Sequence, residues 1–208
     1  MAEGSTQPPH ATRFIETTQG VLSYAQLAPL LGERVLRLLE NIEDETFSAR
    51  PLEESLLLEF HREICADLTP DWAGRLRLTE VRVGQHEPPP PHQVAPLLRD
   101  YFADLQARLD SLNAPDDPLL LEALAFAEGR LLSIHPFTDF NGRVTRLFLA
   151  EILRRLGLPP VDLAPGADSA RTNYLLALRA ADGSDWHPLS ILWQRRLEAS
   201  SGVEDAEA

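Results

Sequence analysis

The sequence predicts an all-α domain with one small β-hairpin. Apolar residues recur at spacings of three and four along most of the 208 residues, which is the period of one helix face. Turn signals rich in glycine and proline separate these segments. Only one stretch alternates apolar and polar residues as a strand does. We therefore expect helices packed around one core, with a short hairpin outside it.

The composition excludes several classes of protein. Hydrophobic residues make up 44% and charged residues 25%, which is typical of a soluble globular domain. The net charge of −13 argues against a nucleic-acid partner, since basic residues gather only around "RVTR" and "EILRR". The longest apolar runs are too short to cross a membrane, and the N-terminus does not resemble a secretory signal. The single Cys65 cannot form an internal disulfide, so a cytoplasmic location is expected.

The helical segments follow from this periodicity. They are expected at 24–42, 51–68, 95–112, 118–134 and 144–158, with two more inside 169–199, broken near Asp182–Pro188. Pro51 and the two acids after it suit a helix start, because proline fits the first turn and acids suit the positive end of the dipole. The segment 118–134 is apolar on most sides and is predicted to be central.

The hairpin is expected within "AGRLRLTEVRVGQHEPPPPHQV". Its alternating apolar residues are Leu76, Leu78, Val81 and Val83. Gly84 offers a turn, and the run Pro88–Pro91 predicts a stiff strap after it. The domain organisation predicted is an N-terminal segment over 1–50, a main domain over 51–195 and a frayed acidic tail over 196–208.

One loop concentrates the chemistry, in "SIHPFTDFNGRVTRLF". Pro136 disfavours a helical conformation at His135, so a loop should join two helices there. The second helix should begin near Asn141 and Gly142, and the free N–H groups of a helix start form a ready anion site. Arg143 and Arg146 lie three residues apart, so both can reach an anion at that loop.

The same loop carries a base and a carboxylate. His135 can act as a general base at neutral pH, and Asp139 beside phosphate suggests a divalent cation such as Mg²⁺. Each of these groups alone is usually structural, and only their conjunction favours a nucleotide phosphate site. Scattered histidines and one cysteine disfavour zinc, and the chain lacks the lysine-containing glycine-rich loop of P-loop proteins.

The stretch "HPFTDFNGRVTR" resembles the signature of Fic proteins, His-Pro-Phe-x-Asp/Glu-Gly-Asn-Gly-Arg-x-x-Arg. Every position fits except Phe140, where the family usually has glycine or another small residue. The resemblance runs from about Leu52 to Trp193 and includes the hairpin, which is similar to the family's flap. It implies the Fic fold, a helical bundle with a small β-hairpin flap.

The resemblance also implies an activity, the transfer of AMP from ATP to a Ser, Thr or Tyr hydroxyl of a target protein. His135 would deprotonate that hydroxyl, and Asp139 would hold Mg²⁺ on the α- and β-phosphates. Backbone N–H groups around Phe140, Asn141 and Gly142 would form the anion hole, with the Asn141 side chain on the α-phosphate.

Further roles follow from the same resemblance. Arg143 and Arg146 would bind the β- and γ-phosphates, and Tyr174 would line the adenine pocket. The flap would dock the target segment as an added strand. Its residues are Val81, Arg82, Val83 and Gly84. The target's identity, and whether the enzyme acts alone or as a homodimer, stay open.

Two positions bear on which reaction runs. Phenylalanine does not prefer the positive φ that glycine allows, so either the Phe140 ring points into the core or the phosphate cradle is altered. We expect the first. At Gly142 the kinase-like Doc branch has lysine, so the small residue favours AMP transfer. The alternatives are a binding module with weak or no catalysis, and a Doc-like kinase or toxin using another nucleotide donor.

Many Fic proteins carry an inhibitory helix with the pattern Ser/Thr-x-x-x-Glu-Gly/Asn. "TRFIET" offers Glu16 after Thr12, and "SSGVED" offers Glu204 after Ser200. We expect the N-terminal one, with Glu16 paired to Arg146, because Gly202 interrupts the second. Inhibition by a separate partner protein is the remaining alternative.

Overall fold

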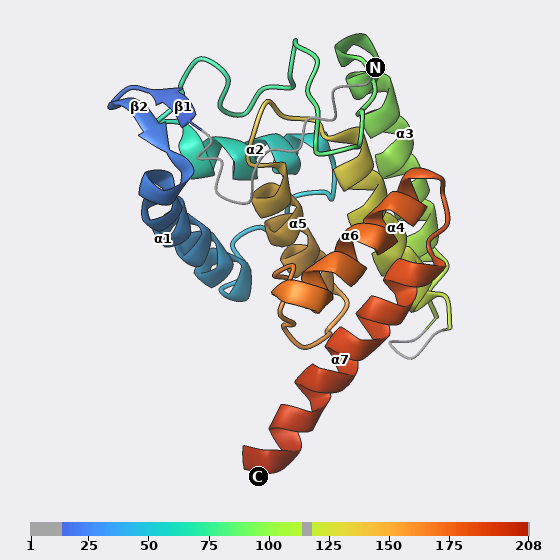
Figure 1. Cartoon of the computed structure of the whole chain (residues 1–208). Coiled ribbons are helices and arrows are strands. Elements are labelled where there is room, and N and C mark those ends of the chain that lie inside the picture. Colours follow the sequence, from blue (N-terminus) through green and yellow to red (C-terminus); the bar gives the residue numbers. More distant parts are fainter. Residues whose placement is uncertain (1–13, 114–117, 208) are drawn as a thin grey trace.

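The computed structural model describes residues 14–113 and 118–207. Within these ranges the chain forms seven helices and one two-stranded sheet (Figure 1), which confirms the predicted all-α class. The strands are β1 (Phe14–Thr17) and β2 (Gly20–Ser23). The helices are α1 (Tyr24–Glu43), α2 (Glu54–Cys65), α3 (Pro91–Asp110), α4 (Leu120–Ile134), α5 (Asn141–Arg155), α6 (Asp168–Asp182) and α7 (His187–Glu207).

Helix α4 is the central element, as its apolar composition predicts. It packs against α3, α5, α6 and α7, and most of its residues are buried. Gly129 makes the close approach of α6 and α7 possible. A Cβ atom there would lie 2.8 Å from the Ala181 Cβ and 2.8 Å from the Leu189 Cδ1, closer than real side chains approach. The C-terminal end of α4, where the predicted site begins, is therefore held by packing on several sides.

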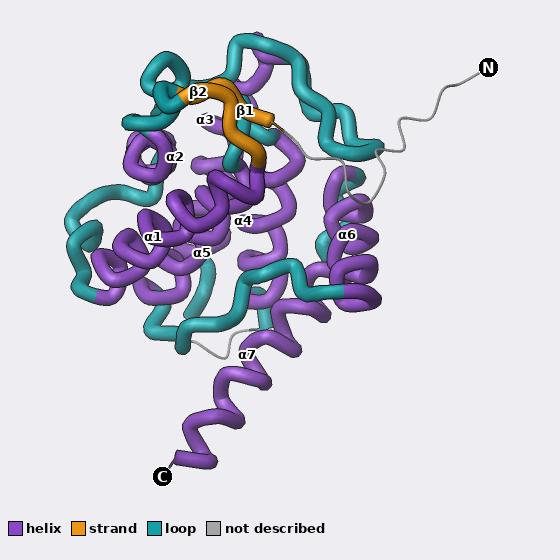
Figure 2. The backbone as a smooth tube through the Cα atoms, turned by 60° about the vertical axis from the view of Figure 1, so that its left-hand side comes forward, coloured by secondary structure: helices purple, strands orange, loops and turns teal. Residues whose placement is uncertain are grey.

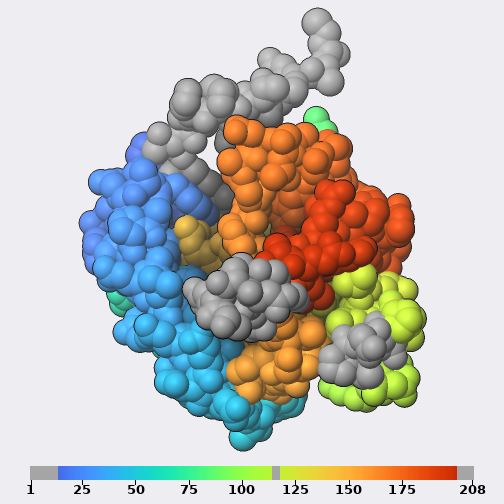
Figure 3. All heavy atoms as spheres, turned by 90° about the horizontal axis from the view of Figure 1, so that it is seen from below, coloured from blue at the N-terminus to red at the C-terminus, as the bar shows by residue number. Residues whose placement is uncertain are grey.

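Helices α1 and α2 pack on α5. In Figure 3 the blue surface of α1 lies on the opposite side of the molecule from the red surface of α7. A capping box starts α1. The Ser23 hydroxyl accepts a hydrogen bond from the Gln26 N–H at 3.3 Å, and the Gln26 side chain accepts one from the Ser23 N–H at 2.9 Å. This cap satisfies free N–H groups of the first turn and fixes the place of Tyr24, the first residue of α1.

The N-terminal segment differs from the predicted inhibitory helix. Phe14–Thr17 is a strand that pairs with Gly20–Ser23 in an antiparallel hairpin, drawn in orange in Figure 2. Ile15 and Thr17 are β-branched, which favours a strand, and Gly20 adopts a φ of 98° that suits glycine. The Thr18 N–H donates to the Leu68 carbonyl at 2.9 Å and ties this hairpin to the segment after α2. Thr12 lies outside the described residues.

The predicted flap is less regular than a hairpin. Between Ala73 and Pro90 the described backbone holds one isolated bridge, from Val83 to His86, around Gly84 with a φ of 60°. The proline strap is also shorter than expected, because Pro91 starts α3. Proline suits the first helical turn, where its missing N–H is not needed.

The C-terminal segment is helical where fraying was expected. Helix α7 runs from His187 to Glu207, so the boundary predicted between 195 and 196 falls inside one helix. The side chain of Glu204 lies outside what the structure describes. Across residues 14–113 and 118–207, no helix combines the length and the apolar character that crossing a membrane requires.

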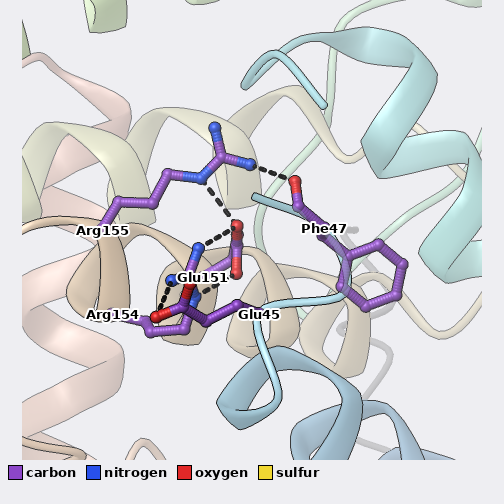
Figure 4. A network of polar contacts seen from close by, with 5 residues as sticks. All are labelled: Glu45, Phe47, Glu151, Arg154 and Arg155. Atoms are coloured by element: carbon purple, nitrogen blue, oxygen red, sulfur yellow. Dashed lines mark hydrogen bonds and ion pairs between the residues drawn. The ribbon is translucent and has the colours of Figure 1, made fainter. Parts of the chain in front are cut away.

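A buried carboxylate anchors the C-terminal end of α5 (Figure 4). Glu151 is fully buried and accepts hydrogen bonds from Arg154 at 3.0 Å and from Arg155 at 2.6 Å. Arg155 also donates to the Phe47 carbonyl at 2.9 Å, in the segment between α1 and α2. Charged groups this deep in the protein need such partners. The network thus joins α5 to the segment that follows α1.

Candidate active site

His135 lies where α4 ends, as the His-Pro pair predicts. Its N–H donates to the Leu131 carbonyl at 3.1 Å, and its backbone adopts the left-handed conformation, with φ 50° and ψ 63°. This conformation is uncommon for residues other than glycine, so the surrounding structure must hold it. The side chain of His135 is half-buried and lines a cavity.

The loop after His135 is closed by its own residues. The Asn141 side chain accepts a hydrogen bond from the Phe137 N–H at 2.9 Å and donates one to the Phe137 carbonyl at 2.9 Å. The Phe137 ring stacks on His61 of α2, with centroids 3.9 Å apart and planes 5° from parallel. The Asn141 amide therefore braces the loop here, whereas the resemblance implied that it contacts an α-phosphate.

Phe140 precedes α5 with its ring in the core. Its φ is 61° and its ψ 11°, the conformation that glycine adopts most easily, and the residue is only 3% exposed. The ring lies beside Trp72 and Tyr24, with centroid distances of 5.5 and 6.4 Å. The expectation that the ring points away from the phosphate cradle agrees with this geometry. The backbone nevertheless keeps the glycine-like shape.

The start of α5 is electropositive. Within residues 14–113 and 118–207, the N–H groups of Asn141 and Gly142 donate no hydrogen bond, and neither Arg143 nor Arg146 forms an ion pair. Burial lowers the pKa of Arg146, and the nearby Arg143 also lowers it. A Cβ on Gly142 would lie 3.6 Å from an Nη atom of Arg146, so the glycine sits directly beside this charge. Free N–H groups, two guanidinium groups and a helix dipole together favour an anion with several negative charges.

Asp139 is almost buried in the same loop, at 7% exposure. One of its carboxylate oxygens accepts hydrogen bonds from the Tyr24 hydroxyl and, at 2.7 Å, from the Phe140 N–H. Among the described residues no group of three His, Cys, Asp or Glu side chains could hold a metal. A lone carboxylate of this kind does not fit zinc. It fits Mg²⁺ that takes its other ligands from phosphate and water.

A cavity of about 230 Å³ opens beside His135. The flap, the last turns of α4 and one face of α6 surround it. Its lining residues are Val83, Gly84, Gln85, His86, Gly129, Leu132, Ser133, His135, Leu175, Leu178, Arg179 and Asp182. Mostly apolar walls with a few polar groups are typical of a small-molecule site.

Comparison with known proteins agrees with this site. The family model described as "Fic/DOC family" matches residues 51–153, which include the loop from His135 to Arg146. The protein adenylyltransferase fic-1 of Caenorhabditis elegans is 37% identical over 144 residues, which are 69% of this chain and 27% of that protein. This chain belongs to the Fic/DOC family. It spans about a quarter of the length of that relative.

Solved Fic domains share the fold at lower identity. The N-terminal Fic domain of Bep8 from Bartonella sp. 1-1C superposes with a TM-score of 0.72 at 16% identity, covering 92% of this chain and 93% of that one. BepC of Bartonella tribocorum, solved with bound AMPPNP, superposes with a TM-score of 0.68 at 19% identity, covering 90% and 93%. The bundle of this Fic domain is thus the one those proteins have.

The structure places Tyr174 on a different cavity from the one beside His135, lined also by Pro160, Asp162 and Arg196. Tyr174 does not line the cavity beside His135, and its hydroxyl donates to buried Glu128 at 2.8 Å. Its neighbour Leu175 lines that cavity. Adjacent positions on a helix point about 100° apart, so Tyr174 and Leu175 face different cavities, and the adenine contact of Tyr174 stays a prediction.

Two polar residues of the cavity escaped the sequence analysis. His86 of the flap places Nδ1 2.9 Å from Asp182 of α6 and Nε2 3.0 Å from the Ser133 carbonyl. Both neighbours are acceptors, so the imidazolium form alone donates to both. The "GQHEPP" turn could have drawn attention to His86, but nothing local to the sequence pairs it with Asp182.

The predicted inhibitory contact is not formed in the described chain. Glu16 is exposed on β1, and no ion pair joins it to Arg146. A strand turns successive side chains to opposite faces, so the helical spacing from Thr12 to Glu16 has no meaning there. The N-terminal inhibitory helix was therefore a wrong prediction for Phe14–Thr17.

Proposed function

We propose that this Fic domain is a protein adenylyltransferase, which moves AMP from ATP to a Ser, Thr or Tyr hydroxyl of a target protein. One observation carries the proposal. A histidine, a nearly buried carboxylate and two arginines without ion-pair partners in the described chain stand within the twelve residues His135–Arg146, which run from the end of α4 into the first turns of α5. The relatives named protein adenylyltransferase support the same reaction.

The nucleotide would lie across two adjoining features. Its phosphates would rest against the N–H groups that begin α5 and against Arg143 and Arg146. Its nucleoside would occupy the cavity between the flap and α6, where Leu175 and Leu178 offer apolar surface. Asp139 would hold Mg²⁺, which when bound neutralises part of the phosphate charge. Gly142 leaves space beside Arg146 for the terminal phosphates.

The chemistry assigned to the chain's own residues is a single displacement. His135 takes the proton of the target hydroxyl, and that oxygen forms a bond to the α-phosphorus of ATP. The bond from the α-phosphorus to the bridging oxygen breaks, and pyrophosphate leaves with its electrons. Arg143 and Arg146 stabilise the negative charge that gathers on the leaving group.

The flap would hold the target segment. Val83 is 43% exposed at the mouth of the cavity, and Leu78 is 90% exposed earlier in the same segment. An irregular, exposed backbone beside the base can accept a target chain as an added strand, which reads backbone groups more than side chains. Val81, Arg82, Val83 and Gly84 are the residues we assign to this contact.

Labelled ATP separates this function from its alternatives. Transfer of an α-phosphate label to protein supports adenylylation, and transfer of a γ-phosphate label instead would mean Doc-like phosphorylation. Nucleotide binding without either transfer would mean a binding module. His135→Ala should lower transfer by roughly 10²–10⁴-fold and keep ATP binding, since a positioned base contributes about that much. Transfer at the wild-type rate in this variant would contradict the role of His135.

A further inference from the structure

Arg77 is a charged residue buried beneath the flap. It is 2% exposed, and it forms no ion pair within residues 14–113 and 118–207. Burial lowers the pKa of its guanidinium. Removing such a charge from water is costly unless hydrogen bonds replace the lost water. The contacts of Arg77 should therefore explain why it stands there.

The guanidinium donates only to backbone carbonyls. Its acceptors are His135 at 2.8 Å from Nε, Thr79 at 3.1 Å from Nη1, Ile134 at 3.4 Å from Nη2, and Pro89, also from Nη2. The backbone N–H of Arg77 donates to the Pro136 carbonyl at 2.9 Å. All the hydrogen bonds of this side chain thus go to backbone carbonyls of two segments, the flap and the end of α4.

These two segments are the ones that the reaction must keep together. Thr79 and Pro89 stand at the two ends of the flap. Ile134 and His135 end α4, where the last carbonyls lack partners inside the helix and carry the negative end of its dipole. One planar group with five donors closes the base of the flap and caps α4 at the same time.

We propose that Arg77 is a positioning residue that fixes His135 relative to the flap. The carbonyl that Arg77 Nε holds belongs to His135 itself, whose left-handed backbone needs external support. Rotation of that peptide would turn the imidazole away from the cavity that it shares with Val83 and Gly84. The effect on catalysis rests on the proposed function, whereas the anchoring of the flap does not.

Lysine is the informative substitution. It keeps a positive charge at the end of α4 but presents a single ammonium group, which cannot span carbonyls on both segments with the planar geometry of arginine. Arg77→Met removes the donors and keeps an unbranched apolar stem. Arg75→Lys is the matched control, because Arg75 is exposed and two residues away.

The experiment compares these variants in the full chain. Thermal unfolding checks that each is folded, and ATP affinity, the kcat of AMP transfer and the rate of trypsin cleavage after Arg82 are measured. For Arg77→Lys we expect ATP affinity within about threefold of wild type and a kcat lower by roughly 10–100-fold, since a displacement near 1 Å can cost that much. Flap cleavage should quicken by about tenfold, because Arg82 is already exposed and local opening frees the backbone around it to enter the protease. Arg75→Lys should match the wild type in all of these.

The readouts separate positioning from simple stabilisation. A lower melting temperature with unchanged kcat and cleavage below that temperature would overturn the proposal, and so would a lower kcat with unchanged cleavage. If Arg77→Met does not fold, Arg77→Lys decides. If the wild-type chain transfers neither phosphate label, the proposed function fails, and the cleavage rate alone decides whether Arg77 anchors the flap.

Discussion

The hydroxyl of Tyr24, the first residue of α1, donates a hydrogen bond to the carboxylate of Asp139 in the loop before α5. The two residues are 115 positions apart in the sequence. The same tyrosine ring lies 6.4 Å from the Phe140 ring and 5.9 Å from the guanidinium carbon of Arg143. The start of α1 is thus part of the surroundings of the candidate Mg²⁺ carboxylate, and no sequence motif around Tyr24 predicts this contact.

Tyr24→Phe should weaken the use of Mg²⁺ and leave the fold intact. The ring keeps its packing against Phe140, and only the donor that orients Asp139 is lost. Partners that orient a metal ligand typically contribute about 10–100-fold to metal affinity or activity. We expect half-maximal transfer at roughly tenfold higher Mg²⁺, measured by titration at saturating ATP.

The control for this variant is Tyr101→Phe. It removes the buried hydroxyl that donates to the Ala127 carbonyl at 3.0 Å, far from Asp139 in the fold. The Ala127 carbonyl keeps its helical partner, so losing this second hydrogen bond should cost about 0.5–1.5 kcal/mol of stability, with an unchanged Mg²⁺ requirement. Equal Mg²⁺ curves for Tyr24→Phe and the wild type would show that Asp139 needs no orientation by Tyr24.

Phe140→Gly should destabilise the protein and keep transfer at or above the wild-type rate. The substitution removes a buried ring, which costs roughly 3–5 kcal/mol, and relieves a left-handed conformation worth about 1–2 kcal/mol. The expected net loss is about 1–4 kcal/mol in denaturant unfolding. The phosphate cradle should be unaffected, because the ring points into the core.

Phe140→Ala separates the cost of losing the buried ring from the relief of the left-handed backbone. Alanine also lacks the ring but keeps the cost of the positive φ, so it should be about 1 kcal/mol less stable than glycine here. Loss of transfer in a stable Phe140→Gly variant would mean that the ring shapes the phosphate site.

Glu151→Gln should be among the most damaging of the conservative substitutions. It leaves Arg154 and Arg155 beside a neutral amide at a fully buried position. Breaking a buried ion pair typically costs about 3–5 kcal/mol, measured here as the free energy of unfolding in urea. Glu122→Gln breaks an exposed pair with Arg108 and should cost less than about 1 kcal/mol. Similar costs for the two variants would contradict the structural role of the Glu151 network.

The loop and its two helices could be predicted from the sequence because their signals are local. The His-Pro pair ends α4 one residue before His135, and Asn-Gly marks the first turn of α5. In both cases the residue's own backbone preference is enough to indicate the boundary. The buried Phe140 ring agrees with the expectation from the sequence, which favoured the core over an altered cradle because the groups assigned to the chemistry are all present.

Other features depend on contacts between distant segments. "FIET" fits a helix or a strand, and pairing with Gly20–Ser23 and the bond from Thr18 to Leu68 decide for a strand. The flap has only one isolated bridge, and it is anchored by Arg77 and His86, which bond to the end of α4 and to α6. A single sequence does not show which distant segments a buried arginine will hydrogen-bond to.

His61 stacks on Phe137 beneath the loop that carries Asp139. Its Nδ1 accepts a hydrogen bond from the Gly74 N–H at 2.8 Å, so this nitrogen is unprotonated in the folded protein. Burial lowers the pKa of His61 from 6.5 to about 4, although a hydrogen bond to the Asp139 backbone opposes this. The folded state therefore favours the neutral imidazole well below neutral pH.

The sign of the pH dependence follows. Above pH 6.5 His61 is neutral in both the folded and the unfolded chain, so it does not make the free energy of unfolding depend on pH. Between pH 6.5 and about 4 the unfolded chain binds a proton that the folded chain does not, so stability falls as the pH falls. The loss should reach about 3 kcal/mol near pH 4 and level off below it. His61→Gln should be less stable than the wild type at pH 7. Its free energy of unfolding in urea should not show this loss between pH 7 and pH 4. If the wild type and His61→Gln lose stability in parallel over this range, other groups cause the acid sensitivity and the neutral His61 beneath the loop does not.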